Sequence, residues 1–327
     1  MAKLHLTTDS SSSECTSQNP QTIDDSTVVL ERAPFDEVQA EGPMIQRMAD
    51  NSHKTALITG ASSGIGEATA LQLAELGFTV YASARRIDRM SDLADRGIRT
   101  RSVDVTDNDS MVALVETIIA DSGRIDVLVN NAGYGLYGAL EDVPIDEARR
   151  QFEVNVFGLA RMTQLVLPQM REQRGGYIVN ISSIGGKIWE PLGSWYHASK
   201  FAVEGLSDSL RVEVAEFGIK VVIIEPGTIK SEWSGIAADN LEATSAHTPY
   251  ARQAKLVGAG LRAADRMPIS SGPEVVAEVI AKAVQDPKPR TRYAAGGGAR
   301  GILLAERILP DRGFDRFIQL SYRFASR

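Results

Sequence analysis

The sequence predicts an α/β fold in which a doubly wound parallel sheet of about seven strands is covered by helices on both faces. Short runs of consecutive apolar residues, typical of strands buried on both faces, alternate with segments of helical periodicity from Lys54 onward. The connections are short and no second hydrophobic pattern follows. We therefore expect one folded domain over residues 54–296, although 327 residues would allow two.

The first half of this domain is expected to contain four strands. The strand in KTALIT leads through a glycine-rich turn into a helix that Gly77 ends. A later helix has apolar residues at i, i+3, i+4, i+7 and i+8 from Met111 and is expected to begin after a Thr106 cap. The other expected elements are strands 79–84, 99–103 and 126–129 and helix 88–95.

The second half is expected to contain three more strands and two long helices. These elements are helix 145–172, strand 177–182, helix 195–217, strand 220–225, an irregular helical insert at 232–268, helix 274–285 and strand 291–295. We interpret the insert as a substrate lid. Residues 297–327 are expected to form an amphipathic, basic helical tail that caps the cleft, extends a subunit interface or touches a membrane.

Composition and charge exclude several classes of protein. The single cysteine, Cys15, leaves no disulfide framework, and four scattered histidines predict no metal site. No apolar run approaches the roughly 18 residues of a transmembrane segment. Outside the acidic first 53 residues the charges nearly balance, so we expect no nucleic-acid partner.

Residues 1–53 form an acidic segment, with nine carboxylates against three basic residues. The segment is rich in Ser, Thr, Asp and Gln and lacks apolar periodicity, so we expect it to be disordered. Met44 and Met48 are alternative translation starts. The segment lacks the apolar core of a secretory signal and is too acidic for a transit peptide, which predicts a cytoplasmic protein.

Three motifs carry the chemistry. Thr59-Gly60-Ala61-Ser62-Ser63-Gly64-Ile65-Gly66 lies where the first strand turns into the first helix, and it is either a plain tight turn or a phosphate-binding turn. Asn130-Asn131-Ala132-Gly133 follows the fourth strand, at the edge where such sheets bind ligands. In Tyr196-x-x-x-Lys200 the phenol and ammonium share a helix face, and a nearby cation lowers a phenol's pKa.

Taken together, the motifs resemble those of the short-chain dehydrogenase/reductase family over residues 54–296. The matching features, in the family's order and spacing, are TGASSGIG (59–66), Asp104-Val105, NNAG (130–133), Asn155, Ser183, Tyr196-x-x-x-Lys200 and Pro226-Gly227. The resemblance implies a Rossmann-fold oxidoreductase that transfers a hydride between a nicotinamide nucleotide and a carbonyl or alcohol. The chain is broadly similar to retinol- and hydroxysteroid-dehydrogenase-like and bacterial carbonyl reductase-like members.

The resemblance also implies catalytic roles for four residues. Tyr196 acts as general acid in reduction and as base in oxidation. Lys200 lowers the Tyr196 pKa and holds the nicotinamide ribose, while Ser183 hydrogen-bonds the substrate oxygen. Asn155 anchors a proton-relay water. We interpret His197 as structural or substrate-facing, because adjacent side chains on a helix diverge by about 100°.

The expected cofactor is NADP(H). In NAD-preferring relatives an acidic residue ends the second strand, whereas here Ala84 is followed by Arg85 and Arg86, whose guanidinium groups suit a 2′-phosphate. The alternative is that the two arginines merely begin a solvated helix. The other expected cofactor contacts are Gly60, Ser62, Ser63, Gly64, Ile65, Gly66, Asp104, Val105, Asn131, Ala132, Gly133, Tyr196, Lys200, Pro226, Gly227 and Ser231, the last in place of the family's usual Thr.

The substrate and assembly are less specified. The expected pocket residues are Tyr134, Ile184, Trp189, Trp195 and Trp233, which favour an apolar ketone or alcohol unless they only pack the insert. The two long helices carry more apolar residues than one sheet face needs, which predicts a homodimer or homotetramer. Two alternatives remain: an epimerase or dehydratase, whose TGxxGxxG pattern is absent, and a non-catalytic nucleotide-sensing protein.

Overall fold

The computed structural model describes residues 51, 53–264 and 266–325, with the backbone alone for 323–325. Apart from Asn51 and His53, the segment expected to be disordered lies outside the described residues.

Among the described residues, seven strands form one parallel sheet. They are β1 (Thr55–Thr59), β2 (Thr79–Ala84), β3 (Arg99–Ser102), β4 (Val127–Asn130), β5 (Gly176–Ile181), β6 (Ile219–Pro226) and β7 (Arg292–Ala295). Their order is β3-β2-β1-β4-β5-β6-β7, and every neighbouring pair is parallel. The chain therefore winds outward in both directions from β1 and β4, and a crevice opens where the winding reverses. The predicted fold class is confirmed.

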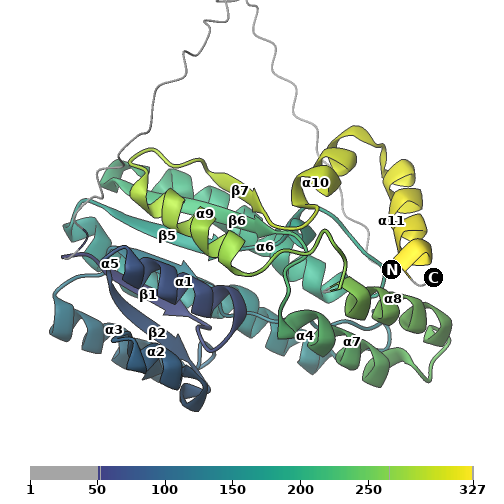
Figure 1. Cartoon of the computed structure of the whole chain (residues 1–327), viewed down its shortest axis with the longest axis horizontal. Helices are drawn as coiled ribbons and strands as arrows, with labels where there is room; N and C mark the ends of the chain where they lie inside the picture. Colours follow the sequence, from purple (N-terminus) through teal and green to yellow (C-terminus); the bar gives the residue numbers. More distant parts are fainter. Residues whose placement is uncertain (1–50, 52, 265, 326–327) are drawn as a thin grey trace, which may run out of the picture. The chain divides into compact units, whose positions relative to one another are not determined.

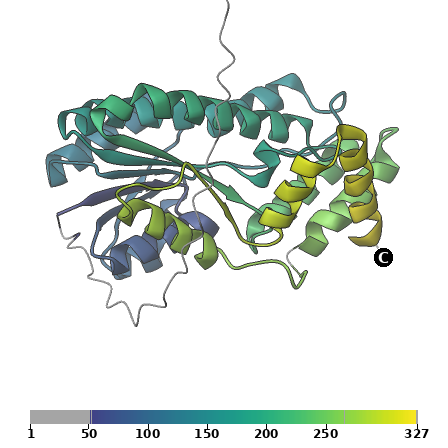
Figure 2. The same ribbon diagram turned by 90° about the horizontal axis from the view of Figure 1, so that it is seen from above.

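Helices cover both faces of this sheet (Figures 1 and 2). Alternate residues of a strand belong to two hydrophobic cores, one on each face of the sheet. On the first face, Ile58 of β1 packs with helices α1 (Gly64–Glu75), α2 (Ser91–Asp95) and α9 (Glu274–Gln285). Its neighbour Leu57 packs on the other face, with the helices α3 (Asn108–Ser122), α5 (Leu159–Glu172) and α6 (Ser194–Glu213). Burial on both faces explains why the strands read as continuous apolar runs.

Four expected helices differ in detail from the structure. Thr106 does not cap α3: its hydroxyl donates to Asp104 Oδ1, and the carboxylate of Asp107 accepts from the Asp109 N–H instead. The expected helix 88–95 begins as a 3₁₀ turn at Ile87–Met90. The expected helix 145–172 is α4 (Ile145–Phe152) and α5, joined by a π-helical segment at Glu153–Gly158. The expected helix 195–217 is α6, which ends at Glu213 and is followed by a 3₁₀ turn, Ala215–Phe217.

The insert and the tail pack together beyond the carboxyl ends of the strands. The insert consists of α7 (Glu232–Ser245) and α8 (Ala251–Ala264), and the tail consists of α10 (Ala299–Ile308) and α11 (Asp311–Ala325). A third core joins them, with Leu241 of α7, Val257 of α8 and Phe314 of α11 among its buried members. No helix within the described ranges is long and apolar enough to cross a bilayer.

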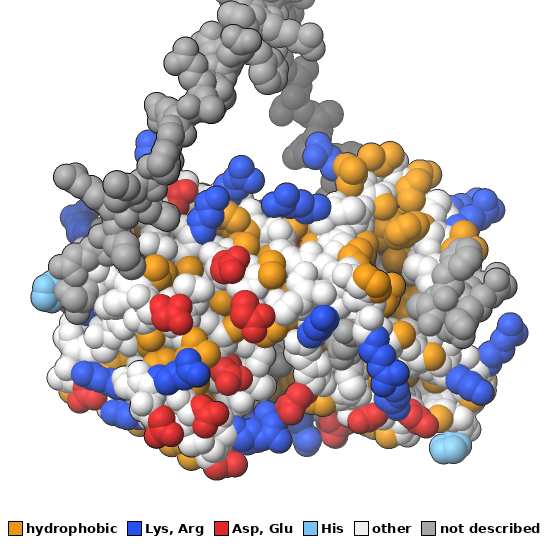
Figure 3. Space-filling view, viewed as in Figure 1, with side chains coloured by type: hydrophobic (Ala, Val, Ile, Leu, Met, Phe, Trp, Pro, Cys, Tyr) orange, Lys and Arg blue, Asp and Glu red, His pale blue; other side chains and the backbone are white. Residues whose placement is uncertain are grey.

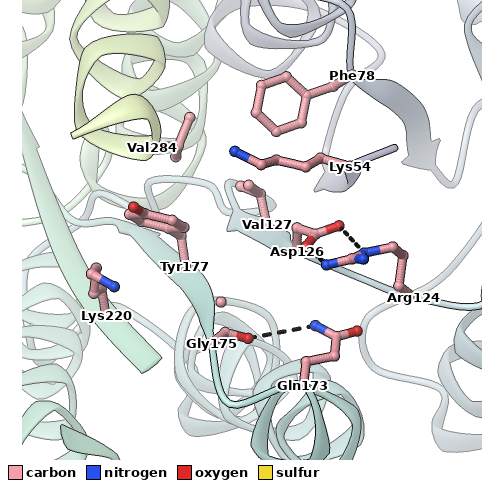
Figure 4. A pocket seen from close by; sticks show the side chains of 11 residues that line it. Lys54, Phe78, Arg124, Asp126, Val127, Gln173, Gly175, Tyr177, Lys220 and Val284 are labelled. Carbon is pink, nitrogen blue, oxygen red and sulfur yellow. Dashed lines mark hydrogen bonds and ion pairs between the residues drawn. The ribbon is translucent and has the colours of Figure 1, made fainter. Parts of the chain in front are cut away.

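A small hollow lies at the opposite edge of the sheet, where the strands begin (Figure 4). Its walls include the ion pair between Arg124 and Asp126, and the Asp126 carboxylate also accepts from the Thr55 backbone N–H at 2.8 Å. The lining contains none of the motif residues. These contacts hold the N-terminal ends of the strands together. Because the motif residues lie elsewhere, the hollow is not the candidate active site.

Candidate active site

Two of the sequence motifs meet at the crevice between β1 and β4. Thr59 Oγ1 accepts hydrogen bonds from the backbone N–H groups of Asn131 and Ala132, both at 3.1 Å. The side-chain amide of Asn131 returns two bonds, from Nδ2 to the carbonyl oxygens of Thr59 and Gly60 at 3.0 Å. The glycine turn and the NNAG turn are therefore fastened together. Thr59 is the residue that fastens them, although its position inside the motif did not suggest this role.

The glycine turn leaves no room for side chains. A Cβ at Gly60, whose φ is +66°, would lie 2.8 Å from Ala132 Cα. A Cβ at Gly66 would lie 2.4 Å from the Gly60 carbonyl oxygen. Ser63, the N-cap of α1, forms no side-chain hydrogen bond with the helix start. Bare backbone at an uncapped helix N-terminus is the cradle that a dinucleotide phosphate fits.

Tyr196 and Lys200 are both buried on one face of α6, and Lys200 lies beside the NNAG turn. The Lys200 ammonium donates to the Ile181 carbonyl oxygen at 2.8 Å, and a Cβ at Gly133 would lie 3.8 Å from its Nζ. Burial lowers the pKa of Lys200 to about 8, although the Glu204 charge opposes the shift. The structure thus brings the second and third motifs together.

The expectation that the Tyr196 pKa is lowered is wrong for the polypeptide alone. Burial raises the pKa of Tyr196 to about 12, which a hydrogen bond from the Ser183 hydroxyl only partly offsets and the Glu190 charge reinforces. The sequence argument counted the neighbouring cation but not the loss of water around the phenol. Tyr196 is therefore a protonated phenol at neutral pH.

Ser183 lies directly after β5 and faces Tyr196. Its Oγ accepts from the Gly185 N–H at 3.0 Å and shares a hydrogen bond with the Tyr196 phenol. The adjacent Ser182 is buried, and its hydroxyl has no partner among the described residues. Of the two serines, Ser183 is the one that reaches the tyrosine, and its hydrogen bond to a substrate oxygen stays a prediction.

Asn155 holds two parts of the site in place from the π-helical segment. Its Oδ1 accepts from the Tyr134 N–H, and its Nδ2 donates to the Tyr134 carbonyl oxygen and to Ser199 Oγ, all at 3.0 Å. Ser199 in turn donates to the carbonyl oxygen of Tyr196 at 2.7 Å. Asn155 is thus a positioning residue for Tyr134 and α6, and its role with a relay water stays a prediction.

His197 is structural. Its Nδ1 lies 2.9 Å from the Gly185 carbonyl oxygen, and its Nε2 accepts from the Glu190 N–H at 3.1 Å, which assigns the proton to Nδ1. The buried ring therefore bridges the start and the middle of the loop between Ser183 and Tyr196, at Gly185 and Glu190.

Aromatic side chains surround Tyr196, but the three tryptophans pack against different partners. The Trp233 ring lies 5.1 Å from the Tyr196 ring and 5.9 Å from the Tyr137 ring, and Ile184 packs against the same core. Trp195 instead packs on Phe152 at 6.3 Å, in a separate cluster that includes Tyr134. Of the described tryptophans, Trp233 alone has a ring contact with Tyr196.

The tail helix α11 covers the loop between Ser183 and Tyr196. Trp189 packs on Phe314 at 5.0 Å, and its indole N–H donates to Asp315 at 2.9 Å. Glu190 accepts hydrogen bonds from Tyr137, at 3.1 Å, and from Tyr322. The sequence analysis missed Glu190, Phe314 and Tyr322. The buried residues of α11 recur at i, i+4 and i+8, a pattern that marks an inward face but not its docking place.

The remaining cofactor candidates line the edge from β2 to β6. Arg85 and Arg86 are exposed just after β2 and form no salt bridge within the described part of the chain. Burial raises the pKa of Tyr134, the Glu147 charge reinforces the shift, and the Arg150 and Arg85 charges oppose it. Ser231 caps α7, and a Cβ at Gly64 would lie 3.7 Å from its Cβ. Other candidates are occupied or enclosed: the Asp104 carboxylate accepts from Thr106, Val105 is buried, and Pro226-Gly227 ends β6 against β7.

The family model for short chain dehydrogenases matches residues 54–241. The chain belongs to the short-chain dehydrogenase/reductase family. Among family members, the oxidoreductase BOA17 of Botryotinia fuckeliana is 35% identical over 246 residues, 74% of this chain and 88% of that one. The 3-ketodihydrosphingosine reductase of Bacteroides thetaiotaomicron is 48% identical over 171 residues, 52% of this chain and 62% of that one.

Solved structures of the family share the fold, and different members have been solved with NADP or with NAD. A short-chain dehydrogenase from Streptomyces avermitilis has a TM-score of 0.66 and 36% identity, covering 82% of this chain and 97% of its own. A metagenomic short-chain oxidoreductase was solved with NADP (TM-score 0.59, 26% identity, 75% and 97% covered). A Burkholderia phymatum member was solved with NAD (TM-score 0.69, 25% identity, 83% and 96% covered).

Proposed function

We propose that this short-chain dehydrogenase/reductase interconverts an apolar ketone and its alcohol with NADP(H). The observation that carries the proposal is the buried pairing of the Tyr196 phenol with the Ser183 hydroxyl, beside Trp233 and the Lys200 ammonium. This pairing offers two hydrogen-bond donors to one carbonyl oxygen.

The cradle of glycines and the free arginines support NADP(H) as the cofactor. Gly60 and Gly66 are enclosed so tightly that only bare backbone fits there, and Arg85 and Arg86 have no carboxylate partner within the described residues. Lys200 would hold the nicotinamide ribose. When bound, the reduced nucleotide supplies a hydride to the carbonyl carbon.

The chain's own residues would orient the carbonyl and supply the proton. Ser183 and Tyr196 hold the carbonyl oxygen, where negative charge develops, and Tyr196 passes its phenolic proton to that oxygen as the alcohol forms. A phenol with a pKa of about 12 is protonated at neutral pH, so it is ready to act as an acid. Oxidation of the alcohol needs the phenolate, which this burial disfavours.

The lining of the site supports an apolar substrate. Trp233, Tyr137 and Ile184 pack around Tyr196 in the third core, and α11 closes over the neighbouring loop. The Bacteroides relative is named for a ketone substrate, in line with reduction of a ketone here. In this proposal the insert, α7 and α8, serves as the lid.

We also propose that the chain forms a homodimer or homotetramer through the face of α6 and the neighbouring π-helical segment. Phe157, Phe201 and Val212 are exposed on these elements, which supports a partner subunit there.

The proposed reaction is tested by incubating the purified protein with NADPH and a panel of ketones and aldehydes graded by chain length. We expect NADPH oxidation that grows with the apolar length of the ketone and is slower with NADH. Turnover confined to small polar aldehydes, or no oxidation with any carbonyl, would contradict the proposal.

A further inference from the structure

The outer face of the tail helices exposes a group of large apolar side chains. This C-terminal patch consists of Ile269, Leu304, Ile308, Leu309, Phe317 and Leu320, which are 37% to 68% exposed. Ile269 is continuous with α10, because a Cβ at Gly298 would lie 3.0 Å from Ile269 Cδ1 and 3.6 Å from Ile302 Cδ1. Figure 3 shows apolar side chains gathered over α10 and α11 in the upper right.

The patch is not needed to hold the tail helices on the domain. Phe314, Ile318 and Tyr322 of α11 are already buried against the third core, and Ile302 and Leu303 anchor α10 there. Phe317 and Leu320 form a second apolar stripe on the same helix, facing outward. An exposed apolar group of this kind marks a surface that contacts a partner.

Arginines border the patch. Arg300, Arg307, Arg312 and Arg316 are exposed, and none forms a salt bridge with another described residue. Three carboxylates lie on the same helices, those of Glu306, Asp311 and Asp315, and Asp315 accepts a hydrogen bond from the Trp189 indole N–H. The patch therefore combines apolar side chains with unpaired positive charge, in a chain whose net charge is −7.

We propose that the C-terminal patch docks on the surface of an anionic lipid bilayer. Apolar side chains of an amphipathic helix enter the boundary between headgroups and acyl chains, while bordering arginines meet lipid phosphates. A second copy of the chain fits the patch less well. The four exposed arginines outnumber the three carboxylates of these helices (Glu306, Asp311 and Asp315), so a two-fold interface would set two surfaces of the same net charge against each other.

Membrane docking and the proposed reaction can fail separately, because lipid binding needs no substrate and no nucleotide. The docking nevertheless bears on the site. The patch lies on the outer side of α11, whose inner side covers the loop between Ser183 and Tyr196. A bilayer on the outer side would bring lipid-dissolved ketones close to that loop.

Vesicle flotation of the full-length protein tests the docking. Vesicles of phosphatidylcholine with phosphatidylglycerol are compared with vesicles of phosphatidylcholine alone, at low and high salt. We expect binding to the anionic vesicles that salt weakens. The double variant Arg307→Gln/Arg312→Gln should bind about tenfold to thirtyfold more weakly, while Arg96→Gln/Arg290→Gln, which removes two exposed arginines elsewhere, should bind like wild type.

The apolar part of the patch is tested in the same assay. Leu304→Ser/Ile308→Ser should weaken binding by about tenfold or more, whereas the comparably exposed pair in Leu140→Ser/Ile145→Ser should not. Thermal melts check that each variant folds. If the Leu304→Ser/Ile308→Ser variant does not fold, the arginine double variant decides the question. Equal binding by patch and control variants, or no binding at all, overturns the proposal. So does a change of oligomeric state in the patch variants by light scattering, which would assign the face to a second copy.

Discussion

Asn155 Nδ2 donates a hydrogen bond to Ser199 Oγ at 3.0 Å and thereby joins the π-helical segment to α6, one residue before Lys200. Ser199 passes the connection on to the carbonyl oxygen of Tyr196. The same Asn155 side chain fixes both backbone groups of Tyr134. One amide therefore connects the residue after the NNAG turn with the backbone of Tyr196.

Replacing Asn155 with Ala should lower both stability and turnover. The Tyr134 N–H loses its acceptor, which costs about 1–3 kcal/mol of unfolding free energy. The Tyr134 carbonyl oxygen keeps its bond from Gln151, and the Ser199 hydroxyl keeps its bond to the Tyr196 carbonyl oxygen. Denaturant unfolding and kcat measure the two effects. Ser199→Ala is the matched control: it removes one of the three Asn155 bonds and the Ser199 bond to the Tyr196 carbonyl oxygen but leaves the Tyr134 N–H paired, so it should cost less. Equal losses in the two variants would contradict the positioning role.

Tyr196→Phe should remove the proton donor and leave the nucleotide cradle intact. We expect kcat for ketone reduction to fall by about 10²–10⁴-fold, the usual contribution of general acid catalysis. The affinity for NADPH, measured by fluorescence titration, should stay within a few-fold of wild type. Turnover close to wild type would remove Tyr196 from the mechanism.

The buried Lys200 should make stability rise with pH between about 8 and 10. Its pKa is about 8 in the folded chain against 10.5 as the ordinary value, so in this window the unfolded chain binds more protons than the folded one. The unfolding free energy then increases with pH, by at most about 1.4 kcal/mol per pH unit. The Tyr196 phenol affects stability only above pH 10. There the folded chain, with a Tyr196 pKa of about 12 against the ordinary 10.0, binds more protons than the unfolded chain, so the unfolding free energy falls again.

Chemical denaturation at a series of alkaline pH values measures this slope. Lys200→Met should flatten it between pH 8 and 10, while Tyr196→Phe should preserve it there. A slope that is unchanged in Lys200→Met would show that another group titrates.

Ala84→Asp combined with Arg85→Ala should move cofactor preference from NADPH toward NADH. A carboxylate at the end of β2 repels a 2′-phosphate, and loss of the guanidinium removes a charge-assisted pair. These contacts are worth about 2–4 kcal/mol, which corresponds to roughly 30-fold to 1,000-fold in the ratio of specificity constants. Measuring kcat/KM with both nucleotides decides the question. Equal constants in the unaltered protein would contradict the NADP(H) preference.

The fold and the motif-bearing positions could be predicted because their signals are local. A strand buried on both faces appears in the sequence as an apolar run. The turn after β1 needs glycines because Gly60 has a positive φ and a Cβ at Gly66 would collide with the Gly60 carbonyl oxygen. Three features could not be predicted in this way. The raised pKa of Tyr196 depends on burial by α11 and α7, the π-helical segment depends on the bonds of Asn155, and the docking of Phe314 on Trp189 joins residues 125 positions apart. Each depends on contacts between distant segments, which periodicity does not report.

The paired hydrogen bonds at Thr59 have a consequence for how a nucleotide would enter. Because Thr59 and Asn131 lock the glycine turn to the NNAG turn, these two walls of the crevice already hold one shape in the polypeptide. Ordering a loop on association costs conformational entropy, and here that ordering has occurred during folding. The diphosphate bridge of a dinucleotide would therefore meet a rigid wall. Any conformational change on binding would occur in the insert and the tail.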